Sequence, residues 1–411
     1  MVKIEIDDRG PRYPGEPGSP AGLKSVLPIV TVALAVAFSL FGDMAIYVVL
    51  PVHYAQLGLS ALQVGILLSA NRWVRLITNH FAERLLRKHG PAVLFPASLL
   101  AGSLIAAAYA TAPSFVVLLI LRIIWGLCWS FIRLTGVMTT IGIAGTQHAA
   151  RSMGVYTGIL QVGFVAGTFG AGLLFDTMGF QTMFLLTAAM SLAAIPPAVL
   201  SNRSSQSHLE ALQASGFRRD RGTLLLEARG FIVSLVGRGL IMSTLGFHLR
   251  SRYGDNVTIG SLEIGITTIN GALLAAQYII NAVGSPLFGI TIDRQGLGRM
   301  QIVAFGVAGT SLLLASQLQS SSLLIPLVIV FFMGASASRL AVESQAAIAG
   351  SRSYSGLATA TDLGSALGPV LGWLGIDMGQ SSPVFWVGGG LFIVGAIFTA
   401  ISPPSITKHK R

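Results

Sequence analysis

The sequence predicts an all-α membrane protein whose twelve transmembrane helices form two pseudo-symmetric six-helix bundles. Of its 411 residues, 53% are hydrophobic and only 10% are charged, which is far from the composition of a soluble globular domain. Apolar stretches of about 20 residues recur along the chain, and each is long enough to cross about 30 Å of hydrocarbon as a helix. An internal repeat divides the chain into two similar parts.

The internal repeat is clearest in two charged turns that lie between apolar stretches. Residues 289–296 read GITIDRQG, and residues 83–90, about 206 positions earlier, read ERLLRKHG. The same offset relates Arg133 to Arg339, and it relates Asn71 to Gln277. Two copies of one membrane unit explain this correspondence.

The twelve apolar stretches also fix the expected topology. They lie near residues 25–52, 61–82, 91–111, 114–138, 150–174, 180–200, 229–249, 263–290, 298–317, 321–345, 354–376 and 383–402. An even number of spans places both termini on one side of the membrane. Basic residues crowd the loops on that side, so by the positive-inside rule we expect both termini to be cytoplasmic and the protein to lie in the inner (plasma) membrane.

The domain organisation follows from the spans. We expect a disordered cytoplasmic tail at 1–24, a six-helix bundle at 25–200, a cytoplasmic linker at 201–228, a second bundle at 229–403 and a basic tail at 404–411. The alternative for part of the linker is a short amphipathic helix that begins near His208. The formal charge of +11 is explained by the basic loops, so we expect the lipid bilayer as partner and no nucleic acid.

No catalytic or metal-binding pattern is apparent. Cys128 is the only cysteine, the histidines lack metal-ligand spacing, and no nucleotide-binding motif is present. We therefore expect neither an enzyme nor a cofactor or metal. We also expect a monomer, and any transport by it must be driven by a gradient, because no nucleotide-binding motif is present.

Several motifs resemble those of the major facilitator superfamily of secondary transporters. The turn with Gly289, Asp293, Arg294, Gly296 and Arg299 is similar to the family's Gly-x-x-x-Asp-Arg-x-Gly pattern and its trailing base, and Arg122 with Gly126 is similar to its Arg-x-x-x-Gly element. The glycines at 154, 163, 167, 170 and 172 resemble the motif of drug–proton antiporters. Thr168 stands where that motif has proline, and a Gly-Pro pair appears instead at Gly368 and Pro369.

The charged turns predict a conformational latch. The Asp293 carboxylate, with Gly289 and Arg294 in the same turn, is suited to the exposed N–H groups at the start of span five, near Arg151. The first-half turn has Glu83 where the motif has glycine and Arg87 where it has aspartate. Glu83 then supplies the missing carboxylate, or the turn is only an anchor for lipid headgroups.

Glycines at intervals of about four predict close helix contacts in two spans. They are Gly154, Gly163 and Gly167 in span five and Gly364 and Gly368 in span eleven. Small residues at this spacing allow helices to approach closely in lipid.

Polar and charged residues at membrane depth are candidates for substrate binding, because each is costly unless it faces a cavity or a partner. Asn71, Arg72 and Arg75 form a polar stripe on one helix face, and Arg238 is a further buried cation. With Trp129 and Tyr278 as apolar walls, they favour an amphipathic or anionic substrate. The alternative for each aromatic residue is ordinary helix contact. Arg133 and Arg339 are expected near the membrane face, and Arg339 is expected to neutralise Glu343.

Asp43 in span one is the candidate proton carrier, with Arg122 in span four at similar depth as its partner and Asp362 in reserve. A substrate carboxylate that reached Arg122 would leave Asp43 free to take up a proton. The alternative is a permanent structural ion pair. We expect proton-coupled efflux of a small organic molecule by alternating access. The alternatives are an importer of an organic anion by symport or exchange, and a receptor or scaffold that does not transport.

Overall fold

The computed structural model describes residues 23–111, 114–202, 221–317, 321–379 and 383–402. The tails expected at 1–24 and 404–411 lie almost entirely outside these ranges, as does most of the linker expected at 201–228, including the alternative amphipathic helix. Within these ranges, the structure does not describe the side chains of Glu83 and Arg87. The predicted domain boundaries therefore stay predictions.

The first part of the chain forms five helices, which we call the first half. They are α1 (Leu23–His53), α2 (Ala61–His89), α3 (Pro91–Tyr109), α4 (Phe115–Leu192) and α5 (Ile195–Asn202). Helix α2 begins with a capping box, in which the Ser60 hydroxyl accepts from the Gln63 N–H and the Gln63 side chain accepts from the Ser60 N–H.

Helix α4 crosses the bundle more than once. Its 78 residues would extend about 117 Å in a straight line, several times the thickness of the hydrocarbon core. The Tyr156 hydroxyl nevertheless lies against Gly136, only 20 positions away, so the helix reverses between them. Gly179 has a φ of 80°, which glycine adopts without strain, and marks a second irregularity.

The rest of the described chain forms the second half. One continuous helical segment comprises α6 (Arg221–Val233), the π-helix η1 (Ser234–Ile241) and α7 (Met242–Tyr253). The strands β1 (Asn256–Ile259) and β2 (Leu262–Gly265) then pair as an antiparallel hairpin. The chain continues through α8 (Ile266–Gln295), α9 (Leu297–Gln317), α10 (Ser321–Ala349), α11 (Ser351–Asp377) and α12 (Pro383–Ile401).

The predicted class, an all-α membrane protein, is confirmed. Nine helical stretches among the described residues are long and apolar enough to cross a membrane. One of them, Arg151–Ser201, has 51 residues, which is enough for two crossings. Helices α2 and α11 are long enough but are not among the nine, and both carry charged side chains in their middle. The count of twelve spans stays a prediction, and the hairpin and the π-helix were not predicted.

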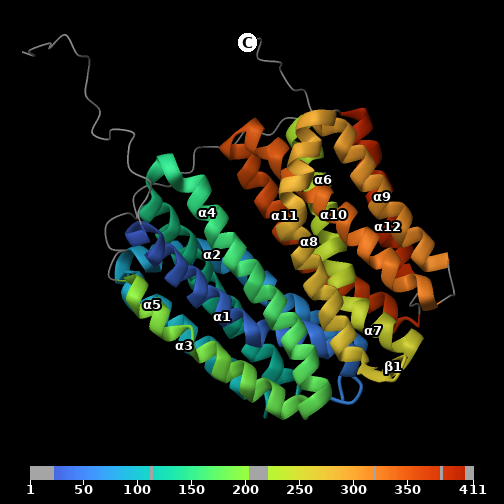
Figure 1. Cartoon of the computed structure of the whole chain (residues 1–411), viewed down its shortest axis with the longest axis horizontal. Helices are drawn as coiled ribbons and strands as arrows, with labels where there is room; N and C mark the ends of the chain where they lie inside the picture. Colours follow the sequence, from blue (N-terminus) through green and yellow to red (C-terminus); the bar gives the residue numbers. More distant parts are fainter. Residues whose placement is uncertain (1–22, 112–113, 203–220, 318–320, 380–382, 403–411) are drawn as a thin grey trace, which may run out of the picture.

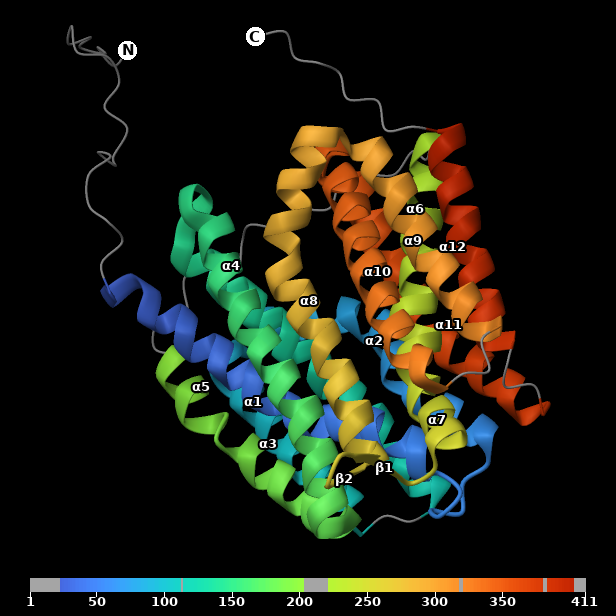
Figure 2. The same cartoon turned by 45° about the vertical axis from the view of Figure 1, so that its right-hand side comes forward.

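The two halves converge at one end of the molecule and diverge at the other (Figure 1 and Figure 2). We call the end that holds the β1–β2 hairpin the closed end, and the end where α1 and α6 begin the open end. At the closed end, α4 lies against α8 and α2 lies against α11. Gly172 and Gly271 allow the first of these contacts, since a Cβ on either would lie 2.5 Å from a carbonyl oxygen of the opposite helix.

Polar contacts between the halves support the closed end. The Asp176 carboxylate accepts from the Thr268 N–H and hydroxyl, both at 2.7 Å, and so caps the first turn of α8. The Asn270 amide donates to the Val48 carbonyl at 2.9 Å, and Arg250 donates to the Val52 carbonyl at 2.6 Å.

Gly172→Ala should therefore separate the halves at the closed end. The new methyl group would overlap the Thr267 carbonyl, and such overpacking costs about 1–3 kcal/mol. Spin labels at Thr111 and Ser261, both exposed at this end, should report a larger population with long distances. Gly170→Ala is the matched control, because a Cβ there has no neighbour within 4 Å. Equal distances in both variants would contradict the tight contact.

Candidate functional site

A cavity of about 460 Å³ lies between the two halves, in the size range of sites for small organic molecules. It receives side chains from α1, α2, α4, η1, α7, α8, α10 and α11, so neither half forms it alone. Eight of the predicted site residues line it: Asp43, Asn71, Arg72, Arg75, Trp129, Arg238, Tyr278 and Asp362.

Asp43 and Arg122 form the predicted ion pair between α1 and α4. Arg122 is 0% exposed and does not line the cavity, whereas Asp43 does. The Arg122 Nε donates to the Leu67 carbonyl at 3.0 Å, and its Nη2 donates to the Tyr47 hydroxyl at 3.1 Å. A substrate carboxylate therefore meets Asp43 first, and the expected direct contact with Arg122 has no open path in this conformation.

Asp362 joins the two halves across the cavity. Its carboxylate oxygens on α11 lie 3.9 Å from an Arg75 nitrogen on α2 and 4.0 Å from an Arg133 nitrogen on α4. These distances are at the long end for ion pairs, and half of the Arg133 side chain is exposed. Arg133 also lines the cavity, and its expected position near the membrane face stays a prediction.

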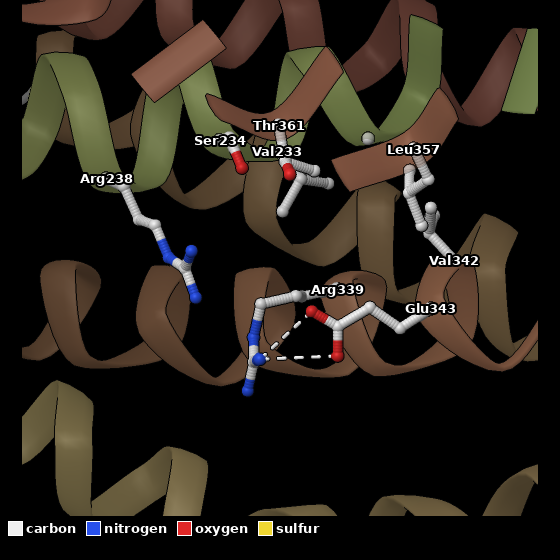
Figure 3. Close-up of a pocket in the computed structure, with 9 residues that line it drawn as sticks. Val233, Ser234, Arg238, Arg339, Val342, Glu343, Leu357 and Thr361 are labelled. Atoms are coloured by element: carbon white, nitrogen blue, oxygen red, sulfur yellow. Dashed lines mark hydrogen bonds and ion pairs between the residues drawn. The ribbon is translucent and has the colours of Figure 1, made fainter. Parts of the chain in front are cut away.

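Arg238 projects into the cavity from the π-helix η1. Its side chain is exposed there, and within the described chain its guanidinium has neither a hydrogen bond nor an ion pair. Figure 3 shows Arg238 and Arg339 reaching from two helices toward the same space, with dashed lines only from Arg339 to Glu343. Arg339 and Glu343 form the predicted ion pair, with 3.1 Å between the Arg339 Nη1 and the Glu343 Oε1. Both residues also line the cavity.

The charges of the cavity wall do not balance. Asp43, Asp362 and Glu343 are the lining carboxylates, and each already has an arginine partner. The lining arginines are Arg72, Arg75, Arg133, Arg238 and Arg339. Arg72 and Arg238 lack a carboxylate partner among the described residues, so the wall has a surplus of positive charge.

Apolar side chains form part of the same wall. Phe164 on α4 and Tyr278 on α8 stack across the boundary between the halves, with ring centroids 4.5 Å apart and planes inclined by 7°. The Tyr278 hydroxyl also lies 3.7 Å from the Met44 sulfur. Trp129 and Met44 add further apolar surface. The cavity thus offers both cationic and aromatic contacts.

The predicted latch residues lie apart from the cavity at the open end. Asp293, Arg294 and Arg151 are exposed, and no ion pair joins the described side chains of Asp293 and Arg151. A Cβ on Gly289 would meet no neighbour within 4 Å. The halves diverge at this end, so the latch stays a prediction for the conformation in which the open end is shut.

The predicted glycines differ in their surroundings. Gly163 and Gly167 lie against α1, where a Cβ would come within 2.7 Å of Ala37 and 3.3 Å of Met44. Gly364 and Gly368 lie equally close to the backbone of the α6–η1 segment. Gly154 has open space around it, so no close helix contact explains that glycine.

Sequence reasoning missed several lining residues. Tyr47, Gln161, Gln277 and Tyr354 are among them. Tyr47 lies one helical turn after Asp43, and Gln277 is the repeat equivalent of Asn71, so spacing and the repeat would have found these two. The sequence contains no comparable signal for Gln161 and Tyr354.

Comparisons with known proteins agree with this geometry. The family model described as Major Facilitator Superfamily matches residues 32–337. Multidrug resistance protein 2 of Bacillus subtilis (strain 168) is 25% identical over 397 residues, covering 92% of this chain and 95% of that protein. Quinolone resistance protein NorA of Staphylococcus aureus (strain MRSA252) is 22% identical over 377 residues, covering 88% and 93%.

Two solved structures share the fold. One is a bacterial homologue of the human lysosomal transporter Spinster in an inward-facing and occupied conformation, with a TM-score of 0.72 and 15% identity, covering 93% of this chain and 96% of that one. The other is a mutant of the nucleoside transporter NupG, with a TM-score of 0.73 and 12% identity, covering 92% and 99%. At these identities the likeness establishes the fold alone.

The two arginines of the site should differ in their effect on stability. Arg122→Gln leaves Asp43, whose side chain is only 9% exposed, without its counter-ion, which should lower the free energy of unfolding by about 3–5 kcal/mol. Arg238→Gln removes a cation without a partner and should leave stability unchanged or slightly higher. Thermal unfolding in detergent without added ligand compares the two. A large loss of stability in Arg238→Gln would mean that this arginine is structural.

Proposed function

Because the chain belongs to the major facilitator superfamily, we propose that it exports a small amphipathic organic molecule in exchange for protons, by alternating access. It is a multi-pass membrane transporter rather than an enzyme. The names of two relatives, which refer to multidrug resistance and quinolone resistance, support export. The halves diverge at the end where α1 and α6 begin, and we assign this end to the cytoplasm because the basic loops lie there.

The observation that carries the proposal is the position of Asp43. Its carboxylate lies in the cavity wall, and its counter-ion Arg122 lies buried behind it. Protonation of Asp43 removes a negative charge from the wall. A substrate that presents a positive or strongly dipolar group to Asp43 therefore binds best when the proton is absent. Mutual exclusion of substrate and proton at one site is the requirement for exchange.

The surplus of arginines favours a second candidate, symport of an organic anion with a proton. An anion beside Arg238 is held more tightly when Asp43 is protonated, because the repulsion between the two negative charges is then lost. Reciprocity of linkage means that the anion also favours protonation, so that both cross together. The charge that a substrate presents to the cavity thus decides between the two mechanisms.

Flux into proteoliposomes with an imposed pH gradient separates the candidates. Exchange predicts that a labelled substrate, tested first with a quinolone antibiotic, accumulates in the acidic compartment, whereas symport predicts the alkaline one. Asp43→Asn should abolish accumulation and retain substrate–substrate exchange. Asp377→Asn, at an exposed carboxylate near the closed end, is the matched control. If Asp43→Asn still accumulates substrate in a pH-dependent way, Asp43 does not carry the proton.

The role of Arg238 is tested by equilibrium binding of an aromatic carboxylate and of its neutral amide. Wild-type protein should bind the acid about tenfold more tightly than the amide, since a charge-assisted hydrogen bond contributes about 1.5–3 kcal/mol. Arg238→Gln should remove this preference and leave the affinity for the amide unchanged. An unchanged preference would assign the anionic group to Arg75 or Arg133 instead.

A further inference from the structure

The Arg72 side chain extends from α2, in the first half, to backbone groups of the second half. Its Nη1 donates to the Arg238 carbonyl of η1 at 2.9 Å and to the Ser365 carbonyl of α11 at 2.5 Å. Only 8% of the residue is exposed, although one edge faces the cavity. A cation in the bilayer thus binds two backbone oxygens rather than a carboxylate.

The Ser365 carbonyl is free for a reason that lies in the sequence. In an α-helix the carbonyl of residue 365 accepts from the N–H of residue 369. Residue 369 is proline, which has no N–H, and it lies inside α11. The carbonyl oxygen therefore has no partner within its own helix, and in a bilayer an unsatisfied backbone group costs several kcal/mol.

The π-helix changes the hydrogen bonding around the Arg238 carbonyl. In regular α-helix it would accept from the Met242 N–H. The Met242 N–H instead donates to the carbonyls of Gly237 and Gly239, the two residues that flank Arg238 in the chain. Each oxygen that Arg72 binds thus lies at an irregularity, a proline in α11 for Ser365 and the wider turn of η1 for Arg238.

The two oxygens come within reach of one nitrogen because η1 and α11 touch through glycines. A Cβ on Gly239 would lie 2.6 Å from the Gly368 Cα. Glycine is therefore required at this crossing, and it brings the two carbonyls together. The arrangement depends on the combination of Gly239, Gly368 and Pro369.

We propose that Arg72 is a positioning residue that holds the two halves together beside the cavity while the closed end is shut. We call Arg72 and the carbonyls of Arg238 and Ser365 the clasp. Opening of the closed end separates α2 from α11 and so requires release of the clasp. This role holds for any substrate and either direction of transport, so it goes beyond the proposed function.

Pro369→Ala tests the clasp without altering any charge. Alanine restores the N–H at position 369, which takes the Ser365 carbonyl back into α11 and removes one of the two acceptors. Pro286→Ala is the matched control, because Pro286 lies inside α8, is exposed, and no described side chain donates to the carbonyl four residues before it. Arg72→Gln removes the donor.

The three single variants and the double variant of Arg72→Gln with Pro369→Ala are compared in lipid nanodiscs. All are made in a Cys128→Ser background, with spin labels at Thr111 and Ser261. The measured quantity is the ratio of molecules in which the closed end is shut to molecules in which it has opened. Pro369→Ala should lower this ratio about tenfold, and Arg72→Gln should lower it at least as much. The double variant should add nothing to Arg72→Gln, since both changes break the same contact. A second label pair at Lys88 and Gln295 should report the opposite change at the open end.

Two outcomes would overturn the clasp. One is that Pro369→Ala gives the same distances as wild type and Pro286→Ala. The other is that the effects of Arg72→Gln and Pro369→Ala add in full, in the distance populations or in the free energy of unfolding. Failure of substrate flux or of proton coupling bears on the proposed function and leaves these measurements unaffected.

Discussion

A charge or a free backbone oxygen inside a bilayer is stable only beside a partner or beside water, and three arginines of this protein satisfy that constraint in different ways. Arg122 pairs with the Asp43 carboxylate, Arg72 binds backbone carbonyls, and Arg238 faces the cavity. Arg75, Arg133 and Arg339, which have carboxylate partners, line the same cavity. The cavity therefore concentrates positive charge between the two halves.

Three polar side chains that join the halves at the closed end have one feature in common, a backbone partner. Asp176 caps a helix start, and Asn270 and Arg250 bind carbonyl oxygens. Water can solvate these backbone groups equally well once the halves part. The net contribution of such a hydrogen bond to stability is about 0.5–1.5 kcal/mol. Contacts of this kind specify a conformation without fixing it permanently, as alternating access requires.

Depth and spacing along the spans were enough to predict part of the site. Asp43 and Arg122 were paired because both lie at similar distances from the same membrane face, and the polar stripe of Asn71, Arg72 and Arg75 identified the cavity face of α2. The role of Arg133 in the cavity wall was not predicted, because the sequence does not show which side chains near a span end turn toward the cavity. The partner of Arg72 was not predictable, since its acceptors depend on how η1 and α11 cross.

Tyr47 connects the Asp43–Arg122 pair to the clasp. The guanidinium carbons of Arg72 and Arg122 each lie 5.2 Å from the centre of its ring, and its hydroxyl accepts from Arg122. A buried ring stabilises one cation by up to about 2 kcal/mol, but two cations at the same ring also repel each other. The Asp43 carboxylate offsets that repulsion. Under the proposed role of Asp43, its protonation removes this compensation beside the Tyr47 ring. Of the two arginines, Arg72 is the one whose hydrogen-bond acceptors lie in the other half.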